Sequence, residues 1–225
     1  MPDRNIIYTK DGSHTVYSSK FDSLYHSSYG AIIESKHIFI ESGLRYFTEK
    51  YNQNLIKILE YGFGTGLNAL LSMDFVANKN FKLEYTGLEA YPLNIDVVSK
   101  LNYLHKTNLL PFKNEFLSMH NNDNILNLKL NGNFIFNKLK IKFEQFDSKD
   151  KFDIIYYDVF GAEIQPGFWL RPHLDKVIDN LSQNGILITY GAKGSFKRAL
   201  KSLGLEVRSL PGPPGKREIT RAVKH

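Results

Sequence analysis

The sequence contains no cysteine, and this absence excludes several kinds of chemistry. A chain without thiols has no disulfide framework, no thiolate metal site and no thiol nucleophile. No apolar run approaches the roughly 20 residues that a membrane-spanning helix needs. The N-terminal stretch MPDRNIIYTKDGS turns polar too soon to be a secretory signal. We therefore expect a cytoplasmic protein with no metal site and no membrane partner.

The composition is that of a folded domain. The chain has 225 residues, of which 42% are hydrophobic and 23% are charged, enough for one large α/β domain with its own core. It shows no internal repeat and no flexible linker. We expect an N-terminal extension over residues 1–54, packed on a core domain over residues 55–225.

Charge is distributed unevenly along the chain. Lys and Arg number 29 against 23 Asp and Glu, a formal net charge of +6. Residues 193–225 hold nine Lys or Arg but only Glu206 and Glu218, so this segment carries +7 and the other 192 residues sum to −1. Such a basic segment favours a polyanionic partner such as nucleic acid. A well-solvated basic tail is the alternative, and charge alone does not separate the two.

Strand and helix patterns alternate along most of the chain. Residues 5–18 read as a hairpin around Asp11-Gly12, and a largely helical stretch follows to Tyr51. Strands are predicted over 55–62, 81–91, 138–146, 151–160 and 185–191, and helices over 66–79, 94–105, 170–181 and 195–204, the last with Ser195 as N-cap and Gly204 past its end. Residues 111–137 are expected to form loops and short helices. Residues 205–210 and 217–225 suit a terminal antiparallel pair.

This alternation predicts a mostly parallel, Rossmann-like sheet with helices on both faces. Ligands of such sheets bind beyond the carboxyl ends of the strands. The glycine loop after the strand at 55–62 and Asp158 at the end of the strand at 151–160 therefore belong to one edge.

The glycine loop LEYGFGTGLN, residues 59–68, does not have the dinucleotide spacing. The fingerprint G-x-G-x-x-G, counted from Gly62, requires glycine at the position of Leu67. Glu60 precedes the loop and would repel a diphosphate, which prefers the positive end of a helix. A cationic ligand has the opposite preference, and the loop therefore favours S-adenosylmethionine, which carries a sulfonium and an ammonium group.

A second acid supports this interpretation. Glu89 ends the next predicted strand, 23 residues after Gly66, where a carboxylate accepts both hydroxyls of a ribose. Either Glu60 or Glu89 alone would be read as a surface carboxylate at a strand end. The loop, its strand and the second acid together favour an adenosyl-sulfonium site.

Asp158 is the candidate for the chemistry. A carboxylate at this edge can orient an incoming amine and accept its proton. The aromatic side chains after it, Phe160, Phe168 and Trp169, are candidates for stacking on a planar substrate. The alternatives are a capping aspartate and core aromatics.

Several segments resemble one family. ILEYGFGTGLNALL, YTGLEAYPL, YYDVFGAEIQPGFW, GPPGKREITRAV and the N-terminal KFDSLYHSSYGAIIESKHIFIE, with Tyr25, Gly30 and Glu34, are similar to the methyltransferase part of bacterial tRNA 5-methylaminomethyl-2-thiouridine synthesis (MnmC/MnmD type). The resemblance spans Asp11 to Lys224. The glycine loop is common to many methyltransferases, whereas the segment from Asp158 to Trp169 and the terminal K-R-E are more specific.

The resemblance implies a class I methyltransferase fold with a seven-stranded sheet. It also implies S-adenosyl-L-methionine as cofactor and methyl transfer to the aminomethyl nitrogen of 5-aminomethyl-(2-thio)uridine at the wobble position of tRNA. The cofactor residues carried over are Glu60, Gly62, Phe63, Gly64, Gly66, Leu67, Asn68, Glu89 on the ribose, and Asp158, which also faces the reacting amine. The substrate residues carried over are Tyr25, Glu34, Phe160, Trp169, Lys216 and Arg217.

Two matters stay open at this point. Lys142 stands where an acid next to adenine is expected, so Glu144 and Asp147 are the remaining candidates for that contact. In many members of the family a flavin-dependent oxidoreductase follows on the same chain. Because this sequence stops at His225, we expect a stand-alone methyltransferase and an oxidative step on a separate protein.

Two other functions are the alternatives. One is a methyltransferase acting on a different amine or small molecule, and the basic C-terminal segment argues against it. The other is a non-catalytic RNA-binding protein with this fold, and the presence of both Glu89 and Asp158 argues against that.

Overall fold

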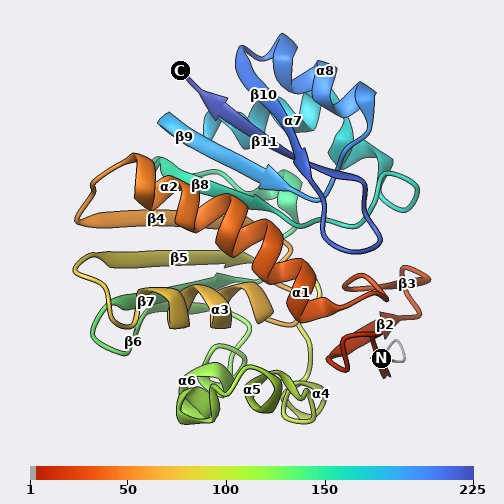
Figure 1. Cartoon of the computed structure of the whole chain (residues 1–225), viewed down its shortest axis with the longest axis vertical. Helices are drawn as coiled ribbons and strands as arrows, with labels where there is room; N and C mark the ends of the chain where they lie inside the picture. The colour runs from red at the N-terminus through yellow and green to blue at the C-terminus, as the bar shows by residue number, and fades with distance from the viewer. Residues whose placement is uncertain (1–3) are drawn as a thin grey trace.

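The computed structural model describes residues 4–225 and begins with the predicted hairpin. Strands β1 (Arg4–Tyr8) and β2 (His14–Ser18) pair antiparallel, and the short β3 (Ser23–Leu24) adds to β2. The Asp11 carboxylate shapes the turn, because it accepts hydrogen bonds from the Ser13 backbone at 2.9 Å and the Thr9 hydroxyl at 2.7 Å. This small sheet lies beside the main sheet, near the start of the first helix (Figure 1).

One long helix follows the hairpin. It consists of α1 (Ala31–Ser35), the π-helical η1 (Lys36–Arg45) and α2 (Tyr46–Lys50) without a break. Its apolar side chains, including Ile38, Phe39 and Leu44, belong to the same buried cluster as the main sheet. The extension predicted over residues 1–54 thus shares the core of the rest of the chain from Arg4 on, and its first three residues lie outside the described part. Its boundary at residue 54 stays a prediction.

The main sheet has eight strands in the order β10-β11-β9-β8-β4-β5-β7-β6. The pairs β9-β8, β8-β4, β4-β5 and β5-β7 are parallel, and the two outer ends of the sheet are antiparallel. The strands are β4 (Leu55–Tyr61), β5 (Lys82–Leu88), β6 (Ile125–Leu130), β7 (Phe134–Leu139), β8 (Phe152–Tyr157), β9 (Leu181–Thr189), β10 (Leu205–Pro211) and β11 (Glu218–Lys224). The α/β class with a mostly parallel sheet is confirmed.

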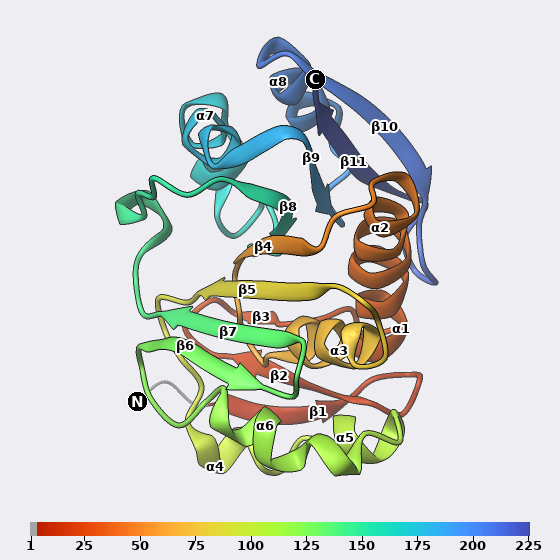
Figure 2. The same ribbon diagram turned by 90° about the vertical axis from the view of Figure 1, so that its left-hand side faces the viewer.

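Helices and short helical turns connect these strands. They are α3 (Leu67–Val76), α4 (Ile95–Val98), α5 (Tyr103–Lys106), η2 (Leu110–Phe112), α6 (Lys113–Ser118), η3 (Phe143–Gln145), η4 (Pro166–Trp169), α7 (Arg171–Asp179) and α8 (Gly194–Ser202). The side view places α1, α2 and α3 on one side of the sheet and α7 on the other (Figure 2). No helix within residues 4–225 is long and apolar enough to cross a membrane.

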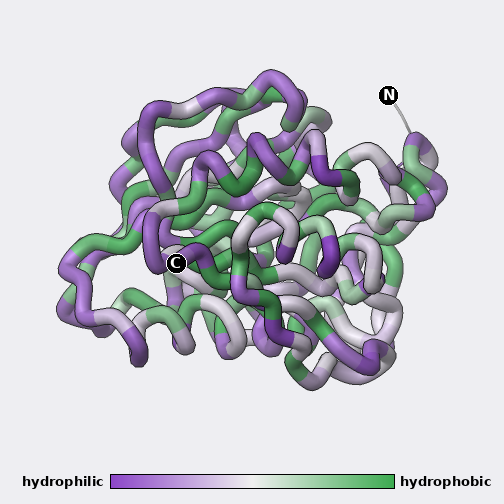
Figure 3. The backbone as a smooth tube through the Cα atoms, turned by 90° about the horizontal axis from the view of Figure 1, so that it is seen from above, coloured by the Kyte–Doolittle hydropathy of each residue, from purple (hydrophilic) through white to green (hydrophobic). Residues whose placement is uncertain are grey.

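Alternating side chains explain why both faces of the sheet are covered. In β8, Ile154 and Tyr156 lie in the cluster under α3, whereas Ile155 and Tyr157 lie in the cluster under α7. Because successive side chains of a strand point to opposite faces, an uninterrupted apolar run buries both. Along the backbone, hydrophobic stretches run through the interior and hydrophilic ones gather toward the outline (Figure 3).

The prediction for residues 111–146 was wrong in two respects. Residues 125–130 form an eighth strand, β6, and the strand predicted over 138–146 lies instead at Phe134–Leu139, followed by a loop and η3. Asn131, with a φ of 36°, makes the turn between the two strands together with Gly132. An Asn-Gly pair between β-forming runs is a hairpin signal, but the surrounding Asn and Lys residues resemble a loop.

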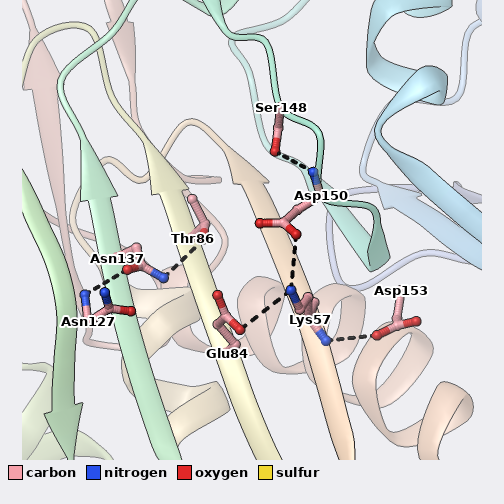
Figure 4. A network of polar contacts seen from close by, with 8 residues as sticks. All are labelled: Lys57, Glu84, Thr86, Asn127, Asn137, Ser148, Asp150 and Asp153. Atoms are coloured by element: carbon pink, nitrogen blue, oxygen red, sulfur yellow. Dashed lines mark hydrogen bonds and ion pairs between the residues drawn. The ribbon is translucent and has the colours of Figure 1, made fainter.

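Polar contacts fix the register at this side of the sheet (Figure 4). Asn127, in the left-handed region at a φ of 53°, interrupts the β6–β7 pairing, and its backbone N–H donates to the Asn137 side chain at 2.8 Å. On β4, the Lys57 ammonium lies 3.8 Å from Glu84 and 3.5 Å from Asp150. Lys57 and Glu84 lie in the first halves of β4 and β5, away from the carboxyl ends of these strands.

Two helix predictions need correction. The helix expected over 94–105 is split into α4 and α5, because the Asn102 side chain turns toward the hairpin, accepting from His14 N–H at 2.8 Å and donating to the Gly12 carbonyl at 2.9 Å. Ser195 is not an N-cap, since α8 begins at Gly194 and no side chain caps it. Gly204, at a φ of 85°, follows α8 as predicted.

Candidate active site

A cavity of about 610 Å³ lies at the carboxyl ends of the parallel strands. The segments after β4, β5, β7 and β8 form its floor and sides, and residues 17–27 of the hairpin region form a further wall. Predicted site residues in its lining are Tyr25, Glu34, Gly62, Phe63, Gly64, Leu67, Asn68, Glu89, Asp158, Phe160, Phe168 and Lys216. The cavity therefore lies at the edge of the sheet where the alternation of strands and helices predicted a ligand site.

The glycine loop lies directly against the strand ends. Gly62, Gly64 and Gly66 all have positive φ, between 53° and 94°, which glycine adopts without strain. A Cβ on Gly62 would lie 2.4 Å from the carbonyl oxygen of Asp158. Glycine at this position therefore lets the loop pass directly beside the end of β8.

Glu89 connects the loop after β4 with the loop after β5. One carboxylate oxygen accepts the Gly64 N–H at 2.9 Å and the other accepts the Tyr91 N–H at 2.8 Å. Burial raises the pKa of Glu89, and these two hydrogen bonds oppose that rise. A carboxylate has about four acceptor positions, so Glu89, which lines the cavity, still has acceptor positions in addition to these two bonds.

Asn68 joins two carboxylates at the floor of the cavity. Its side-chain nitrogen donates to Glu60 Oε1 at 2.8 Å and to Asp158 Oδ2 at 2.9 Å. Glu60 is fully buried, and burial, followed by the charge of Asp158, raises its pKa well above the ordinary value. Both donor hydrogens of Asn68 are thereby used, and its role is to hold the two acids beside one another.

Asp158 has a strongly altered acidity. Burial first, and the Glu34 carboxylate second, raise its pKa to about 8, while the Asn68 hydrogen bond and the Lys216 ammonium oppose this. Lys216 Nζ lies 3.3 Å from Glu34 Oε2 and 4.7 Å from the centre of the Tyr190 ring. A carboxyl group with a pKa near neutrality is suited to accept and release protons.

Aromatic side chains form the wall on the hairpin side. Phe21 packs on Phe160 with ring centres 4.7 Å apart and on Tyr91 at 5.7 Å, and Tyr25 meets Phe160 edge-on at 5.4 Å. Arg4 secures this wall, because it donates to the Tyr25 hydroxyl and to the Tyr91 carbonyl, the latter at 2.8 Å. The N-terminal sheet therefore encloses the site as well as adding to the fold.

Four predicted site residues do not line the cavity. Glu60 and Gly66 lie behind it, and Trp169 is 7% exposed and donates its indole N–H to the Phe160 carbonyl at 2.8 Å. Arg217 points to solvent on the outer surface. The expected stacking of Trp169 on a substrate is therefore not supported, since its ring packs against Tyr157, Tyr190 and Phe196 inside the protein.

The segment after β7 decides between the two acids that the sequence left open. Lys142, Phe143 and Glu144 line the cavity, and Asp147 does not, so Glu144 is the remaining candidate for the contact with adenine. Phe143 also contacts Phe168, with ring centres 5.3 Å apart. Nothing in the sequence marked Phe143, because it follows a strand that was placed too far along the chain.

Sequence reasoning also missed His26, Tyr190 and Glu163 as lining residues. His26 is buried, its ring contacts the Thr15 and Thr65 hydroxyls, and burial lowers its pKa to about 4, so it is neutral at pH 7. Tyr190 donates to the Val159 carbonyl at 2.7 Å. A single His, Tyr or Glu outside a recognisable motif carries no sequence signal for a site.

The residues present fit S-adenosylmethionine. The lining holds six carboxylates (Asp22, Glu34, Glu89, Glu144, Asp158, Glu163) and two lysines (Lys142, Lys216), a formal balance of −4 in a chain of net charge +6. Such a lining favours a cationic sulfonium. Glu89 has free acceptor positions for hydroxyls, and Phe143 offers a ring for adenine.

Known proteins resemble this chain along most of its length. The tRNA 5-methylaminomethyl-2-thiouridine biosynthesis bifunctional protein MnmC of Leptospira interrogans is 30% identical over 218 residues, 91% of this chain and 33% of that protein. Its counterpart from Campylobacter fetus is 24% identical over 225 residues, 96% of this chain and 35% of that protein. The chain thus spans about a third of the length of these curated relatives.

A solved structure shares the fold. The crystal structure of MnmC2 from Aquifex aeolicus superposes with a TM-score of 0.75 at 19% identity, over 99% of this chain and 70% of that one. Residues 100–225, more than half of the chain, match the family described as S-adenosyl-L-methionine-dependent methyltransferase. The chain therefore belongs to this family of S-adenosyl-L-methionine-dependent methyltransferases.

Proposed function

We propose that the protein transfers a methyl group from S-adenosylmethionine to the aminomethyl nitrogen of 5-aminomethyl-(2-thio)uridine at the wobble position of tRNA. The observation that carries this proposal is an acidic cavity in a basic protein. Six carboxylates against two lysines suit a cationic amine, whereas the net charge of +6 suits a polyanion that carries it.

The cofactor would be held by the loop from Gly62 to Leu67 and by Glu89. When bound, S-adenosylmethionine supplies an electrophilic methyl group on a positively charged sulfur. Glu60 stands behind the loop and adds negative charge or a hydrogen bond there, depending on its protonation. The roles of these residues follow from their chemistry and position.

Asp158 would prepare the nucleophile. A primary alkyl ammonium, like that of lysine, has an ordinary pKa of about 10.4 and is protonated at neutral pH, and its lone pair is free only after a proton leaves. A carboxylate whose pKa is raised to about 8 takes that proton far more readily than an ordinary aspartate. Asn68 holds Asp158 in place for this transfer, across 2.9 Å.

The tRNA partner is supported by the names of the relatives and by the surface of this chain. The proteins from Leptospira and Campylobacter are named for tRNA 5-methylaminomethyl-2-thiouridine biosynthesis. Exposed cations of this chain, including Arg198, Lys201 and Arg217, lie on its C-terminal segment. The relatives are bifunctional, and an oxidative step on a separate flavin-dependent protein stays a prediction.

Mass spectrometry of wobble nucleosides tests the proposal. The protein and S-adenosylmethionine are incubated with tRNA that carries 5-aminomethyluridine. The expected product is a nucleoside heavier by one CH₂ group, about 14 mass units. Unmodified tRNA serves as the control. Methylation of the unmodified control, or a lack of methylation in both samples, would refute the proposed substrate.

A further inference from the structure

Three charged side chains from distant parts of the chain meet in the cavity. Glu34 comes from α1, Asp158 follows β8, and Lys216 comes from the turn before β11. All three line the cavity. Glu34 raises the pKa of Asp158 and Lys216 opposes it, so both lie within electrostatic reach of that carboxyl group.

One carboxylate oxygen of Glu34 is hydrogen-bonded to the backbone, and the other has no hydrogen-bond partner among the described residues. Oε1 accepts the Ser27 N–H at 3.1 Å, which fixes the orientation of the carboxylate. Oε2 is buried and has no hydrogen-bond partner within residues 4–225, although Lys216 Nζ lies 3.3 Å away. A buried carboxylate oxygen that is paired by charge alone still has acceptor capacity for a ligand N–H.

The backbone of Lys216 is held in a tight turn, and its side chain is partly exposed. Gly215 has a φ of 86°, and a Cβ there would lie 2.3 Å from the Tyr29 ring, so the turn is pressed against that ring. The Lys216 N–H closes the turn on the Pro213 carbonyl at 2.9 Å. The Lys216 ammonium pairs with Glu34 and lies over the face of the Tyr190 ring, and its side chain is 26% exposed.

We propose that Glu34 binds the ammonium group of the substrate, and that Lys216 occupies this position until the substrate enters. The two cations have the same charge and similar donors, so the substrate replaces the Lys216 ammonium without leaving the buried Glu34 uncompensated. The displaced side chain rotates toward solvent on a fixed turn. This inference rests on the proposed function, because it takes an amine as substrate.

The exchange places the ammonium beside its base. With Glu34 on one side, the amine lies next to Asp158, and departure of Lys216 removes a positive charge that lowers the basicity of Asp158. Other groups facing Asp158 are Glu60 from β4, Tyr85 from β5 and Tyr190 after β9. The proposed exchange does not involve these three groups, so Glu34 and Lys216 determine the change in the basicity of Asp158.

Binding of two nucleosides to matched variants tests the inference without turnover. Calorimetry with 5-aminomethyluridine and with uridine is carried out on the wild type, Lys216→Met, Glu34→Gln and Lys113→Met, the last an exposed control on α6. Lys216→Met is expected to bind 5-aminomethyluridine about fivefold more tightly and Glu34→Gln about fivefold more weakly. Uridine affinity is expected to be the same in all four.

The carboxyl resonance of Asp158 gives a second readout. Its NMR titration is expected to move to higher pH in Lys216→Met and to lower pH in Glu34→Gln, because these substitutions remove charges of opposite sign. Weaker binding of the amine by Lys216→Met, or no difference between the two nucleosides in the wild type, would overturn the inference. Amine binding that depends on Glu34 without methylation of tRNA would keep this site and reject the proposed function.

Discussion

The Asn68 side-chain nitrogen donates to Asp158 across 2.9 Å, linking the first turn of α3 to the end of β8. The same nitrogen donates to Glu60 at 2.8 Å. One amide thus holds two carboxyl groups whose pKa values are both raised. The acidity of Asp158, the stability of the fold and the activity are therefore expected to depend on the same few contacts around Asn68.

Asp158→Asn is expected to abolish methyl transfer and to stabilise the fold. In the folded protein the pKa of Asp158 is raised from 3.8 to about 8, so the folded state keeps a proton that the unfolded chain loses. This contribution is complete below pH 4 and is lost as the pH rises through 8. The variant, which never ionises, should gain about 1–3 kcal/mol over the wild type at pH 8, a range that allows for solvent screening because Asp158 is partly exposed.

Urea denaturation of both proteins at pH 4, 6 and 8 measures this gain, and calorimetry checks that the variant still binds S-adenosylmethionine. The stability difference should be smallest at pH 4 and largest at pH 8. A difference that does not change with pH would mean that Asp158 titrates at its ordinary value.

Gly62→Ala is expected to be destabilising and to reduce activity strongly. The φ of 94° at this position is unfavourable for alanine, and its Cβ would lie 2.4 Å from the Asp158 carbonyl. The loss should exceed about 1 kcal/mol. Gly132→Ala is the matched control, because a Cβ there meets nothing within 4 Å. Equal melting temperatures for the two variants would contradict the close approach of the loop to β8.

Glu89→Ala is expected to weaken binding of S-adenosylmethionine by about 1.5–3 kcal/mol, the range for hydrogen bonds to a charged group. It also leaves the Gly64 and Tyr91 N–H groups without their acceptor, so the melting temperature should fall. Calorimetry on the folded variant measures the affinity. Unchanged affinity together with a lower melting temperature would limit Glu89 to holding the two loops.

Local patterns in the sequence were sufficient for the frame of the site. Two strand ends could be recognised from the sequence: the one followed by the glycine loop from Glu60 to Gly66, and the one at Asp158. Because strands and helices alternate, both ends were expected at the same edge of the sheet, where the cavity lies. Such inferences succeed because successive βα units place their loops at the same side of the sheet. Asn131-Gly132 was misread because a polar composition outweighed a two-residue turn signal.

Side-chain direction was not predictable in the same way. Lys197 belongs to the basic C-terminal segment, but its ammonium bonds to Glu218 and Ser209, both at 2.7 Å. Lys216 and Arg217 are neighbours in sequence, yet one lines the cavity and the other is exposed. Charge and spacing are local properties, whereas these directions depend on residues brought close by the fold, such as Glu34.

The difference between Lys216 and Arg217 leads to a prediction on tRNA docking. Each phosphate contact releases counterions, so loss of one contact should reduce the slope of log affinity against log salt by about 0.7–0.9. We expect Arg217→Ala and Arg198→Ala to flatten this slope, because both side chains are exposed on the C-terminal segment. Lys197→Ala should leave the slope unchanged and lower stability instead, since it breaks the ion pair with Glu218.

Titration of tRNA binding at several salt concentrations measures these slopes, with Lys113→Met as the control for loss of one exposed cation on α6. S-adenosylmethionine affinity should be the same in every variant, because none of these side chains lines the cavity. Equal flattening by Lys113→Met would indicate a general effect of net charge. An unchanged slope in both Arg217→Ala and Arg198→Ala would place the tRNA backbone away from the C-terminal segment. The net charge of +7 on residues 193–225 would then be solvated and would not contact tRNA.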